Sequence, residues 1–285
     1  MANLIDGKLL SQKIKDEVKK SVSEFKNTFN RDISLAVILV GENPASAVYV
    51  KNKLKATEYV GIKSLSYHMP EDSSFEDVSS VVKTLANDDN VDGILVQLPL
   101  PKHIDEEKIL SLIPVEKDVD GFTSMNAGNL LLGKDCLYPC TPHGIIQMIN
   151  SIGFDLTGKK AVVLGRSNIV GKPIALMLLE KNATVTICHS KTTNLKDICK
   201  EADVIVAAIG RPKFVTKDMV KEGAVVIDVG INRMENGLCG DVDFENVKDI
   251  ASYITPVPGG VGPMTIAMLM SNAYTCATRR ENNNA

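Results

Sequence analysis

The segment GRSNIVGKP at residues 165–173 constrains the fold of this chain more than any other part of it. It follows the apolar run 161–164 and leads into the apolar, helix-forming stretch 174–179. A buried strand, a tight glycine turn and a helix start together begin a dinucleotide-binding fold, in which backbone N–H groups and the positive helix end attract a pyrophosphate. We expect Gly165 to permit the turn and Gly171 to let the helix start pack closely. Because the glycine spacing differs from the usual G-x-G-x-x-G, an ordinary strand–helix turn is the alternative.

The next strand, 183–188, indicates which dinucleotide would bind. An NAD site usually has Asp or Glu about 20 residues after the glycine turn, where it binds the ribose hydroxyls. No acidic residue occurs at 188–194, and the chain has His-Ser-Lys-Thr at 189–192 instead. Arg166 and Lys191 would attract the extra phosphate of NADP, whereas a carboxylate would repel it. The sequence therefore favours NADP over NAD. A solvated loop lysine is the alternative for Lys191, but the missing acid supports NADP without it.

Composition and charge exclude several classes of protein. The 285 residues are 44% hydrophobic, enough for one large domain or two ordinary ones, and the formal net charge is −3, which gives no sign of nucleic-acid binding. No apolar run reaches the roughly 18 residues that cross a bilayer, and the charged, amphipathic start does not resemble a signal peptide. Six cysteines without a CxxC motif suit reduced thiols. We therefore expect a cytoplasmic protein with neither nucleic-acid nor membrane partners.

A metal site has little support in the sequence. Cys136, Cys140 and His143 are close together in the chain and could suggest metal ligands, but a fourth ligand is not evident. Buried cysteines that pack as small hydrophobic residues are the preferred interpretation. We expect no metal.

Helical and strand patterns alternate in both halves of the chain. In the first half we predict helices at 7–29, 44–60 and 75–88, and strands at 33–40, 62–68 and 93–98. After a loop-rich stretch at 114–140 and a helix at 142–152, the second half has strands near 161–164, 184–188, 203–207 and 225–229. Such alternation predicts parallel β-α-β units.

The order of these elements predicts an α/β fold of two domains. Residues 1–140 would form an N-terminal α/β domain, and residues 141–262 a Rossmann-type parallel-sheet domain that binds NADP. The last helix, at about 263–279, follows the completed second sheet. We therefore expect the C-terminal segment 263–285 to return and complete the first domain.

Two candidate functional side chains lie on the predicted helix 44–60. Tyr49 and Lys53 are four positions apart, so they share a helix face. In this arrangement Tyr49 could position an amine and hydrogen-bond to it. Because Lys51, Lys53 and Lys55 alternate, spacing alone favours a solvated lysine face instead.

Three polar side chains mark further candidate positions. Gln97 lies near the carboxyl end of an apolar strand, where ligands bind in open α/β sheets, and either the backbone or a ligand would satisfy its amide. Leu98-Pro99 then indicates a cis bond or a rigid turn. Asp118 and Asp120 lie two apart in the loop PVEKDVDGF and would bind a metal, cap a helix or accept donors from a ligand ring. For Asp120, an ordinary Asp-Gly turn is the alternative.

The segment TPVPGGVGPMT at 255–265 contains three prolines and three glycines in its eleven residues. It would be stiff at the prolines, while its glycines would let a ligand approach closely. A flexible linker is the alternative, but the apolar helix that follows favours a packed loop that lines a site. The chain has no Ser-His-Asp triad, P-loop or HExxH motif.

Together these motifs closely resemble the bifunctional methylenetetrahydrofolate dehydrogenase/cyclohydrolase family. The resemblance covers nearly the whole chain, in the family's order: IDGK, YVKNK, GILVQLPLP, KDVDGF, PCTPHGI, GRSNIVGKP, CHSKT, AAIGRP, DVGIN, GDVDF and TPVPGGVGPMT. It implies a folate-binding catalytic domain completed by the last helix, a Rossmann-type NADP domain and a homodimer. The implied enzyme oxidises 5,10-methylenetetrahydrofolate to 5,10-methenyltetrahydrofolate with NADP, and then hydrolyses that product to 10-formyltetrahydrofolate.

The resemblance also implies roles for single residues. Lys53 would be central to the hydrolysis with support from Tyr49 and Gln97, and Asp120 would accept hydrogen bonds from the pterin ring, so these four are the catalytic candidates. The cofactor candidates are Gly165, Arg166, Ser167, Ile169, Gly171, Ser190, Lys191, Gly210 and Ile231. The substrate candidates are Tyr49, Asp120, Pro258, Gly259 and Pro263.

Two other functions compete with this interpretation. Another two-domain NADP oxidoreductase, similar to shikimate dehydrogenase and acting on a small keto acid, would explain the second half of the chain. It leaves the Tyr49/Lys53 pair and the KDVDGF motif without a role. A non-catalytic NADP-binding regulatory module would need the first half to be only a scaffold.

Overall fold

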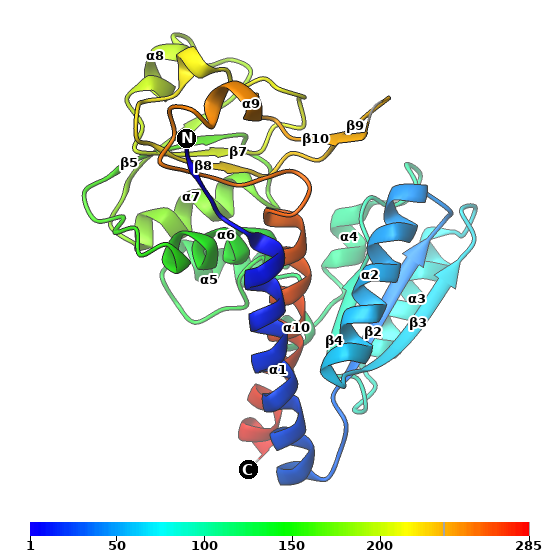
Figure 1. The fold of residues 1–285 in the computed structure, drawn as a ribbon. Helices are drawn as coiled ribbons and strands as arrows, with labels where there is room; N and C mark the ends of the chain where they lie inside the picture. The colour runs from blue at the N-terminus through cyan, green and yellow to red at the C-terminus, as the bar shows by residue number, and fades with distance from the viewer. Residues whose placement is uncertain (236, 285) are drawn as a thin grey trace. The chain divides into compact units, whose positions relative to one another are not determined.

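The computed structural model describes residues 1–235 and 237–284, and the chain divides into two compact units (Figure 1). We call Met1–Ser11 with Thr141–Thr265 the six-stranded unit, and Gln12–Cys140 with the residues from Ile266 onward the three-stranded unit. This division, with strands and helices alternating in each unit, confirms the predicted two-domain α/β fold. Among the described residues, no helix is both long and apolar enough to cross a membrane.

A fully parallel sheet in the order β1-β11-β8-β7-β5-β6 forms the centre of the six-stranded unit. Its strands are β1 (Asn3–Leu4), β5 (Lys160–Leu164), β6 (Thr184–Cys188), β7 (Val204–Ala207), β8 (Val225–Asp228) and β11 (Tyr253–Ile254). Strands β7 and β8 are buried along their whole length, as is typical of central strands with elements packed on both faces. Val163 of β5 is paired with Ile187 of β6 on one side and Val206 of β7 on the other.

The strand order indicates where along this sheet a ligand is expected to bind. From β5 the chain moves outward to β6 and then crosses to β7, on the other side of β5. The connection direction therefore reverses between β5 and β7. Open parallel sheets bind ligands outside the carboxyl ends of the strands at such a point.

Helices and a hairpin complete the six-stranded unit. The helical elements are α6 (Cys140–Ser151), α7 (Gly171–Glu180), α8 (Leu195–Lys200), η2 (Lys217–Met219) and α9 (Phe244–Val247). Strands β9 (Asn232–Met234) and β10 (Gly237–Cys239) form an antiparallel hairpin that belongs to neither large sheet. Figure 1 shows this hairpin extending away from the rest of its unit.

The first eleven residues belong to the six-stranded unit, whereas the predicted domain boundaries grouped them with residues 12–140. Asn3 and Leu4 of β1 pair with Tyr253 and Ile254 of β11, so backbone hydrogen bonds make this segment an edge of the six-stranded sheet. The start of α1 is also held there, because the Lys8 N–H donates to the carbonyl of Gly259 at 3.0 Å.

A parallel sheet in the order β3-β2-β4 forms the centre of the three-stranded unit. Its elements are α1 (Gly7–Phe29), β2 (Ser34–Val40), α2 (Pro44–Val60), β3 (Lys63–Met69), α3 (Phe75–Ala86), β4 (Gly93–Val96), α4 (Glu106–Leu110), η1 (Val115–Lys117), α5 (Ser124–Leu131) and α10 (Val261–Asn284). Along β2, alternate residues contribute to two apolar cores: Leu35 and Val37 pack with α1, α2 and α10, while Ala36 and Ile38 pack with α3 and α4. This alternation is the period of an extended strand.

Charge pairs around the buried Asp92 hold the far end of the C-terminal helix to this unit. Arg31 donates to both carboxylate oxygens of Asp92, at 2.9 and 2.8 Å, and the Asp92 side chain is fully buried. Arg280 of α10 approaches Asp92 within 3.4 Å, and Glu281 contacts Arg31 Nε at 2.5 Å. Asp92 also accepts from the Ser34 N–H at 2.9 Å, so α10 is linked to the start of β2. The predicted return of the last helix is thereby confirmed.

Candidate functional site

Lys53 belongs to the buried face of α2. Val50, Lys53 and Thr57 are 8%, 6% and 1% exposed, and Val60 continues the same face one turn later. In contrast, Lys51 and its counterpart at position 55 are exposed. The solvated lysine face that spacing favoured is therefore wrong for Lys53, because this lysine occupies a position in the stripe of the helix that packs on the sheet.

Gln97 is the hydrogen-bond partner of the buried lysine. It follows β4 directly, and its Oε1 accepts a hydrogen bond from Lys53 Nζ at 3.0 Å. Its Nε2 donates to the carbonyl of Leu98 at 2.6 Å, and the Leu98-Pro99 peptide is cis. The backbone therefore fixes the amide so that its oxygen faces the lysine, at the carboxyl edge of the three-stranded sheet.

Asp120 lies near this pair in a loop that Asp118 shapes. Asp118 is 2% exposed and accepts hydrogen bonds from the N–H groups of Phe122 and Thr123 at 3.1 and 2.8 Å. Asp118 thus has the structural role of holding the turn. The turn requires glycine at position 121, because φ there is 68° and a Cβ would lie 2.5 Å from the Leu137 carbonyl oxygen.

The charge of Asp120 is sensitive to its surroundings. Burial raises the pKa of the Asp120 carboxyl to about 6, and the negative charge of Asp118 adds to that effect. The positive charge of Lys53 lowers the same pKa. Lys53, Gln97 and Asp120 therefore form an interacting group within one unit, with an amine, an amide and a carboxyl whose pKa burial raises to about 6.

Tyr49 lies one helical turn before Lys53 on the same face of α2 and is partly buried. Burial raises the pKa of its phenol, so the hydroxyl stays protonated and able to donate a hydrogen bond at neutral pH. The structure thus places all four predicted catalytic residues in the three-stranded unit.

Asn272 was not among the predicted residues, and packing was the preferred interpretation for Cys140. Asn272 of α10 is 4% exposed, and its Nδ2 donates to the carbonyls of Val119 and Tyr138 at 2.8 and 2.9 Å. The Cys140 thiol also donates to the Val119 carbonyl, at 3.3 Å. The Val119 carbonyl, directly before Asp120, is therefore fixed by hydrogen bonds from both Asn272 and Cys140. An amide side chain inside the stretch 261–277, which has no charged residue, was the available signal.

The glycine turn of the six-stranded unit has the close packing that its sequence predicts. Gly165 follows β5 with φ of 117°, and a Cβ there would lie 2.2 Å from the carbonyl oxygen of Ala208, which follows β7. Helix α7 begins at Gly171, where a Cβ would lie 2.4 Å from the Gly165 carbonyl oxygen. A side chain at position 165 would collide with the loop after β7, and one at position 171 would collide with the turn after β5, at the point where the strand order reverses.

The N–H groups at the start of α7 already have an acceptor. Ser167 Oγ accepts from the N–H groups of Val170 and Gly171, each at 3.2 Å, and the Ser167 carbonyl accepts from Lys172 at 3.0 Å. This differs from the expectation that free helix N–H groups attract a pyrophosphate. Arg166 and Ile169 are exposed beside this turn.

The loop after β6 continues the same edge of the sheet. The Gly165 N–H donates to the carbonyl of Cys188 at 2.9 Å, which joins the ends of β5 and β6. Ser190 and Lys191 are exposed, and the His189 N–H donates to Thr192 Oγ1 at 2.9 Å. With close-packed glycines, exposed hydroxyl and basic side chains and no carboxylate at 188–194, the residues present fit an NADP.

Gly210 and Ile231 follow β7 and β8 at this edge. Gly210 has φ of 63°, and Ile231 is 47% exposed. The carboxyl edge of the six-stranded sheet therefore brings together all nine predicted cofactor residues, from the loops after β5, β6, β7 and β8.

The predicted folate-side loop belongs to the six-stranded unit, whereas Tyr49 and Asp120 belong to the three-stranded unit. Pro258 is exposed, Gly259 has φ of 107°, and Pro263 lies in the first turn of α10. The loop is packed, as predicted: the Gly259 carbonyl accepts from the Lys8 N–H at 3.0 Å, and a Cβ at Gly260 would lie 2.6 Å from the Pro256 carbonyl oxygen.

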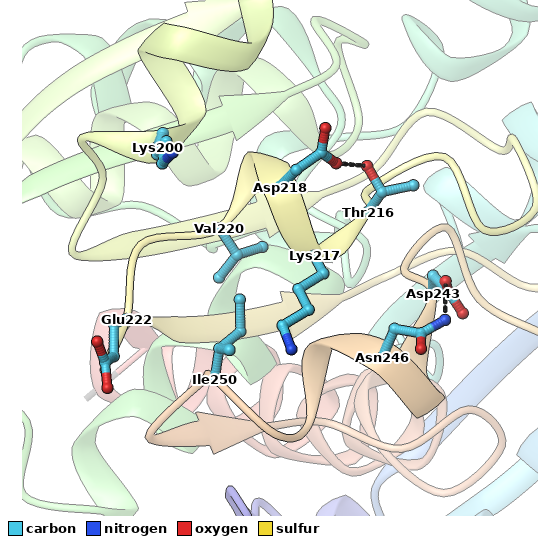
Figure 2. A pocket seen from close by; sticks show the side chains of 9 residues that line it. All are labelled: Lys200, Thr216, Lys217, Asp218, Val220, Glu222, Asp243, Asn246 and Ile250. Carbon is cyan, nitrogen blue, oxygen red and sulfur yellow. Dashed lines mark hydrogen bonds between the residues drawn. The ribbon is translucent and has the colours of Figure 1, made fainter.

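Two other features of the described residues give no candidate site. No group of three or more His, Cys, Asp or Glu side chains in the described part of the chain is arranged to hold a metal ion. Figure 2 shows a pocket of the six-stranded unit that contains none of the predicted residues. Lys200, Glu222 and Ile250 of its lining precede β7, β8 and β11, away from the carboxyl edge. Within this pocket the Thr216 hydroxyl donates a hydrogen bond to Asp218 Oδ1 at 2.5 Å.

Comparison with known proteins gives full-length relatives. A family model for the tetrahydrofolate dehydrogenase/cyclohydrolase catalytic domain matches residues 5–120, and one for the NAD(P)-binding domain of the same family matches residues 139–281. A protein of Agathobacter rectalis named bifunctional protein FolD is 58% identical over 280 residues, which are 98% of this chain and 100% of the relative.

Solved structures give the same result. The bifunctional FolD enzyme of Campylobacter jejuni is 52% identical, with a TM-score of 0.96 over 98% of this chain and 100% of that one. The Trypanosoma brucei enzyme, solved with NADP and an inhibitor, is 36% identical, with a TM-score of 0.95 and 98% of both chains covered. Shikimate dehydrogenase of Aquifex aeolicus is 16% identical, with a TM-score of 0.54 over 87% of this chain and 97% of that one, and so shares the fold alone. This chain therefore belongs to the tetrahydrofolate dehydrogenase/cyclohydrolase family.

Proposed function

We propose that this chain is a bifunctional one-carbon folate enzyme. It oxidises 5,10-methylenetetrahydrofolate to 5,10-methenyltetrahydrofolate with NADP and then adds water to give 10-formyltetrahydrofolate. The observation that carries the proposal is the buried pair of Lys53 Nζ and Gln97 Oε1, 3.0 Å apart, next to the titratable carboxyl of Asp120. An isolated NADP-binding regulatory module has no use for a buried amine held in this way. Membership in the family and the fit of the second unit to a dinucleotide support the same function.

The first step requires positioning more than proton transfer. Loss of a hydride from the carbon that bridges two folate nitrogens leaves a cation, which those nitrogens stabilise. NADP, when bound, supplies the hydride acceptor for this step. It would be held by Gly165, Arg166, Ser167, Ile169, Gly171, Ser190, Lys191, Gly210 and Ile231. Asp120 would accept hydrogen bonds from the pterin ring, while Pro258, Gly259 and Pro263 would support the folate from their loop.

The second step requires control of protons. Water forms a bond to the cationic carbon, one carbon–nitrogen bond then breaks, and the nitrogen that leaves keeps the bonding electrons while the water gives up its protons. Lys53 is the group that moves a proton between the water and the leaving nitrogen. Gln97 fixes the direction of the Lys53 amine through its Oε1, and the protonated hydroxyl of Tyr49, one helical turn away on the same face of α2, is available as a hydrogen-bond donor to the substrate.

The chain would act in the cytoplasm as a homodimer. The hairpin of β9 and β10 supports self-association because Met234 and Leu238, on its two strands, are 49% and 43% exposed. Large apolar side chains on a projecting hairpin favour contact with another protein surface.

One assay tests the proposed function against its alternatives. Purified protein is mixed with 5,10-methylenetetrahydrofolate and NADP, and the absorbance of NADPH and of the methenyl compound is followed. We expect NADPH to form with the folate, and added methenyltetrahydrofolate to be hydrolysed without NADP. Turnover of small keto acids such as dehydroshikimate with NADPH, and none with folates, would refute the proposal. NADP binding without any turnover would favour the regulatory module.

A further inference from the structure

We propose that Asp241 is a positioning residue that shapes the two loops after β7 and β8, at which Gly210 and Ile231 are proposed to contact NADP. The inference rests on the proposed NADP binding and adds a residue to it. Asp241 follows the hairpin strand β10 and is 0% exposed, so its carboxylate itself cannot act as a surface ligand.

The Asp241 carboxylate accepts three consecutive backbone N–H groups from the loop after β7. Oδ2 accepts from Ile209 at 2.7 Å and Gly210 at 2.9 Å, and Oδ1 accepts from Arg211 at 2.8 Å. Successive N–H groups that converge in this way form the type of concave site that binds anions. Here a protein carboxylate occupies it, so the loop at Gly210 keeps a fixed shape and cannot offer these N–H groups to a phosphate.

The same carboxylate fixes the loop after β8. Its Oδ1 also accepts from Asn232 Nδ2 at 2.9 Å, directly after the exposed Ile231. Gly230 is adjacent, and a Cβ there would lie 2.2 Å from Asp241 Oδ1, so only glycine fits beside the carboxylate. The four N–H donors named here are neutral groups, so among the described residues hydrogen bonds satisfy the buried Asp241 oxygens.

A second buried carboxylate holds Asp241 in place. Asp228, at the end of β8, is 3% exposed and accepts from the N–H groups of Asp241 and Val242 at 2.8 and 2.9 Å. Burial raises the pKa of Asp228 to about 7, and the negative charge of Asp241 adds to this. A Cβ at Gly240 would lie 1.8 Å from Asp228 Oδ2. The DVGIN and GDVDF motifs are thus two halves of one internal scaffold for these loops.

The test is a comparison of Asp241→Asn with Asp249→Asn, which removes the same charge from an exposed position in the same unit. NADP binding is measured by isothermal titration calorimetry, and methenyltetrahydrofolate hydrolysis is measured without NADP. An asparagine amide turns an N–H₂ group toward donors, so part of the network loses its acceptor. We expect Asp241→Asn to weaken NADP binding by about tenfold or more, or about 1.4 kcal/mol. Hydrolysis should stay within about twofold, and Asp249→Asn should change neither.

Several outcomes would overturn the inference. An unchanged NADP Kd in folded Asp241→Asn would show that the loops do not depend on this carboxylate. Equal loss of NADP binding and hydrolysis would indicate general structural damage and not positioning. If Asp241→Asn does not fold, Asn232→Ala removes one donor only, and we expect it to weaken NADP binding by about threefold. An unchanged Kd in that variant would also overturn the inference. Failure of the wild-type protein to bind NADP would instead refute the proposed function.

Discussion

Replacement of Lys53 by methionine should separate hydrolysis from cofactor binding. A positioned acid–base group typically contributes about 10²–10⁴-fold to a rate, which corresponds to about 3–5 kcal/mol of activation free energy. We therefore expect Lys53→Met to slow methenyltetrahydrofolate hydrolysis by that factor. NADP binding should be unchanged, because the proposed cofactor residues belong to the other unit.

The structure indicates that this variant should fold. Lys53 is 6% exposed, and methionine has a similar length and an apolar stem, so it can occupy the same buried stripe of α2. The substitution removes one hydrogen bond, from Nζ to Gln97 at 3.0 Å, but it also removes the need to bury an amine. We expect the free energy of unfolding to change by no more than about 2 kcal/mol. Loss of the Lys53 charge, which lowers the pKa of Asp120, should raise that pKa above about 6.

The assay compares Lys53→Met with Lys51→Met, in which an exposed lysine of the same helix is replaced. The decay of the methenyl absorbance gives the hydrolysis rate, calorimetry gives the NADP Kd, and urea denaturation gives stability. Hydrolysis within about threefold of wild type in a folded Lys53→Met protein would refute the assigned role. So would an equal loss in Lys51→Met, since that lysine does not contact Gln97.

Further predictions concern Asp120, the cofactor phosphate and the hairpin. Asp120→Asn should raise the folate KM by about tenfold or more at an unchanged NADP Kd, since an amide oxygen accepts fewer hydrogen bonds than a carboxylate; equal folate KM values in steady-state kinetics would contradict the pterin role. Burial raises the pKa of Asp120 to about 6, so kcat/KM for the folate should fall as pH decreases through about 6, and this step should be absent in Asp120→Asn. The effect of Asp120 on stability has the opposite sign, because a carboxyl whose pKa is higher in the folded state favours folding at low pH. This contribution to the free energy of unfolding should be lost as the pH rises from 3.8 through about 6. Denaturation at several pH values measures it. Lys191→Glu should raise the NADP KM by about tenfold and leave the NAD KM nearly unchanged, because only NADP carries the additional phosphate; parallel changes in both would indicate general damage. Leu238→Asp should shift the protein from dimer to monomer in light scattering after size exclusion, and a dimer that survives would place the interface elsewhere.

Much of the fold was predictable because its signals are local. Glycine turns and apolar periodicity located every strand of the two large sheets except the two-residue strands β1 and β11. Those two are too short to show a period, and they form only because distant segments of the chain pair with each other. Helix α2 was predicted with the bounds 44–60 that the structure shows.

The site was harder to predict, because its decisive contacts join distant positions. Local spacing favoured a solvated Lys53, and only packing of α2 on the sheet buries its amine against Gln97, 44 residues later. Asn272 holds the Val119 carbonyl from 153 positions away. The role of Asp241, whose acceptor contacts reach back 32 residues to Ile209, likewise requires the folded chain. Sequence patterns identify such residue types, but they do not pair them.

The last helix has a consequence for how the protein is made. Its residues from Ala267 to Ala277 complete the apolar core of the three-stranded unit, whose strands are encoded near the start of the chain. During translation, β2, β3 and β4 are therefore made long before the helix that completes their core. A protein that lacks this helix would accordingly expose the apolar face of its early strands and helices to proteolysis and aggregation.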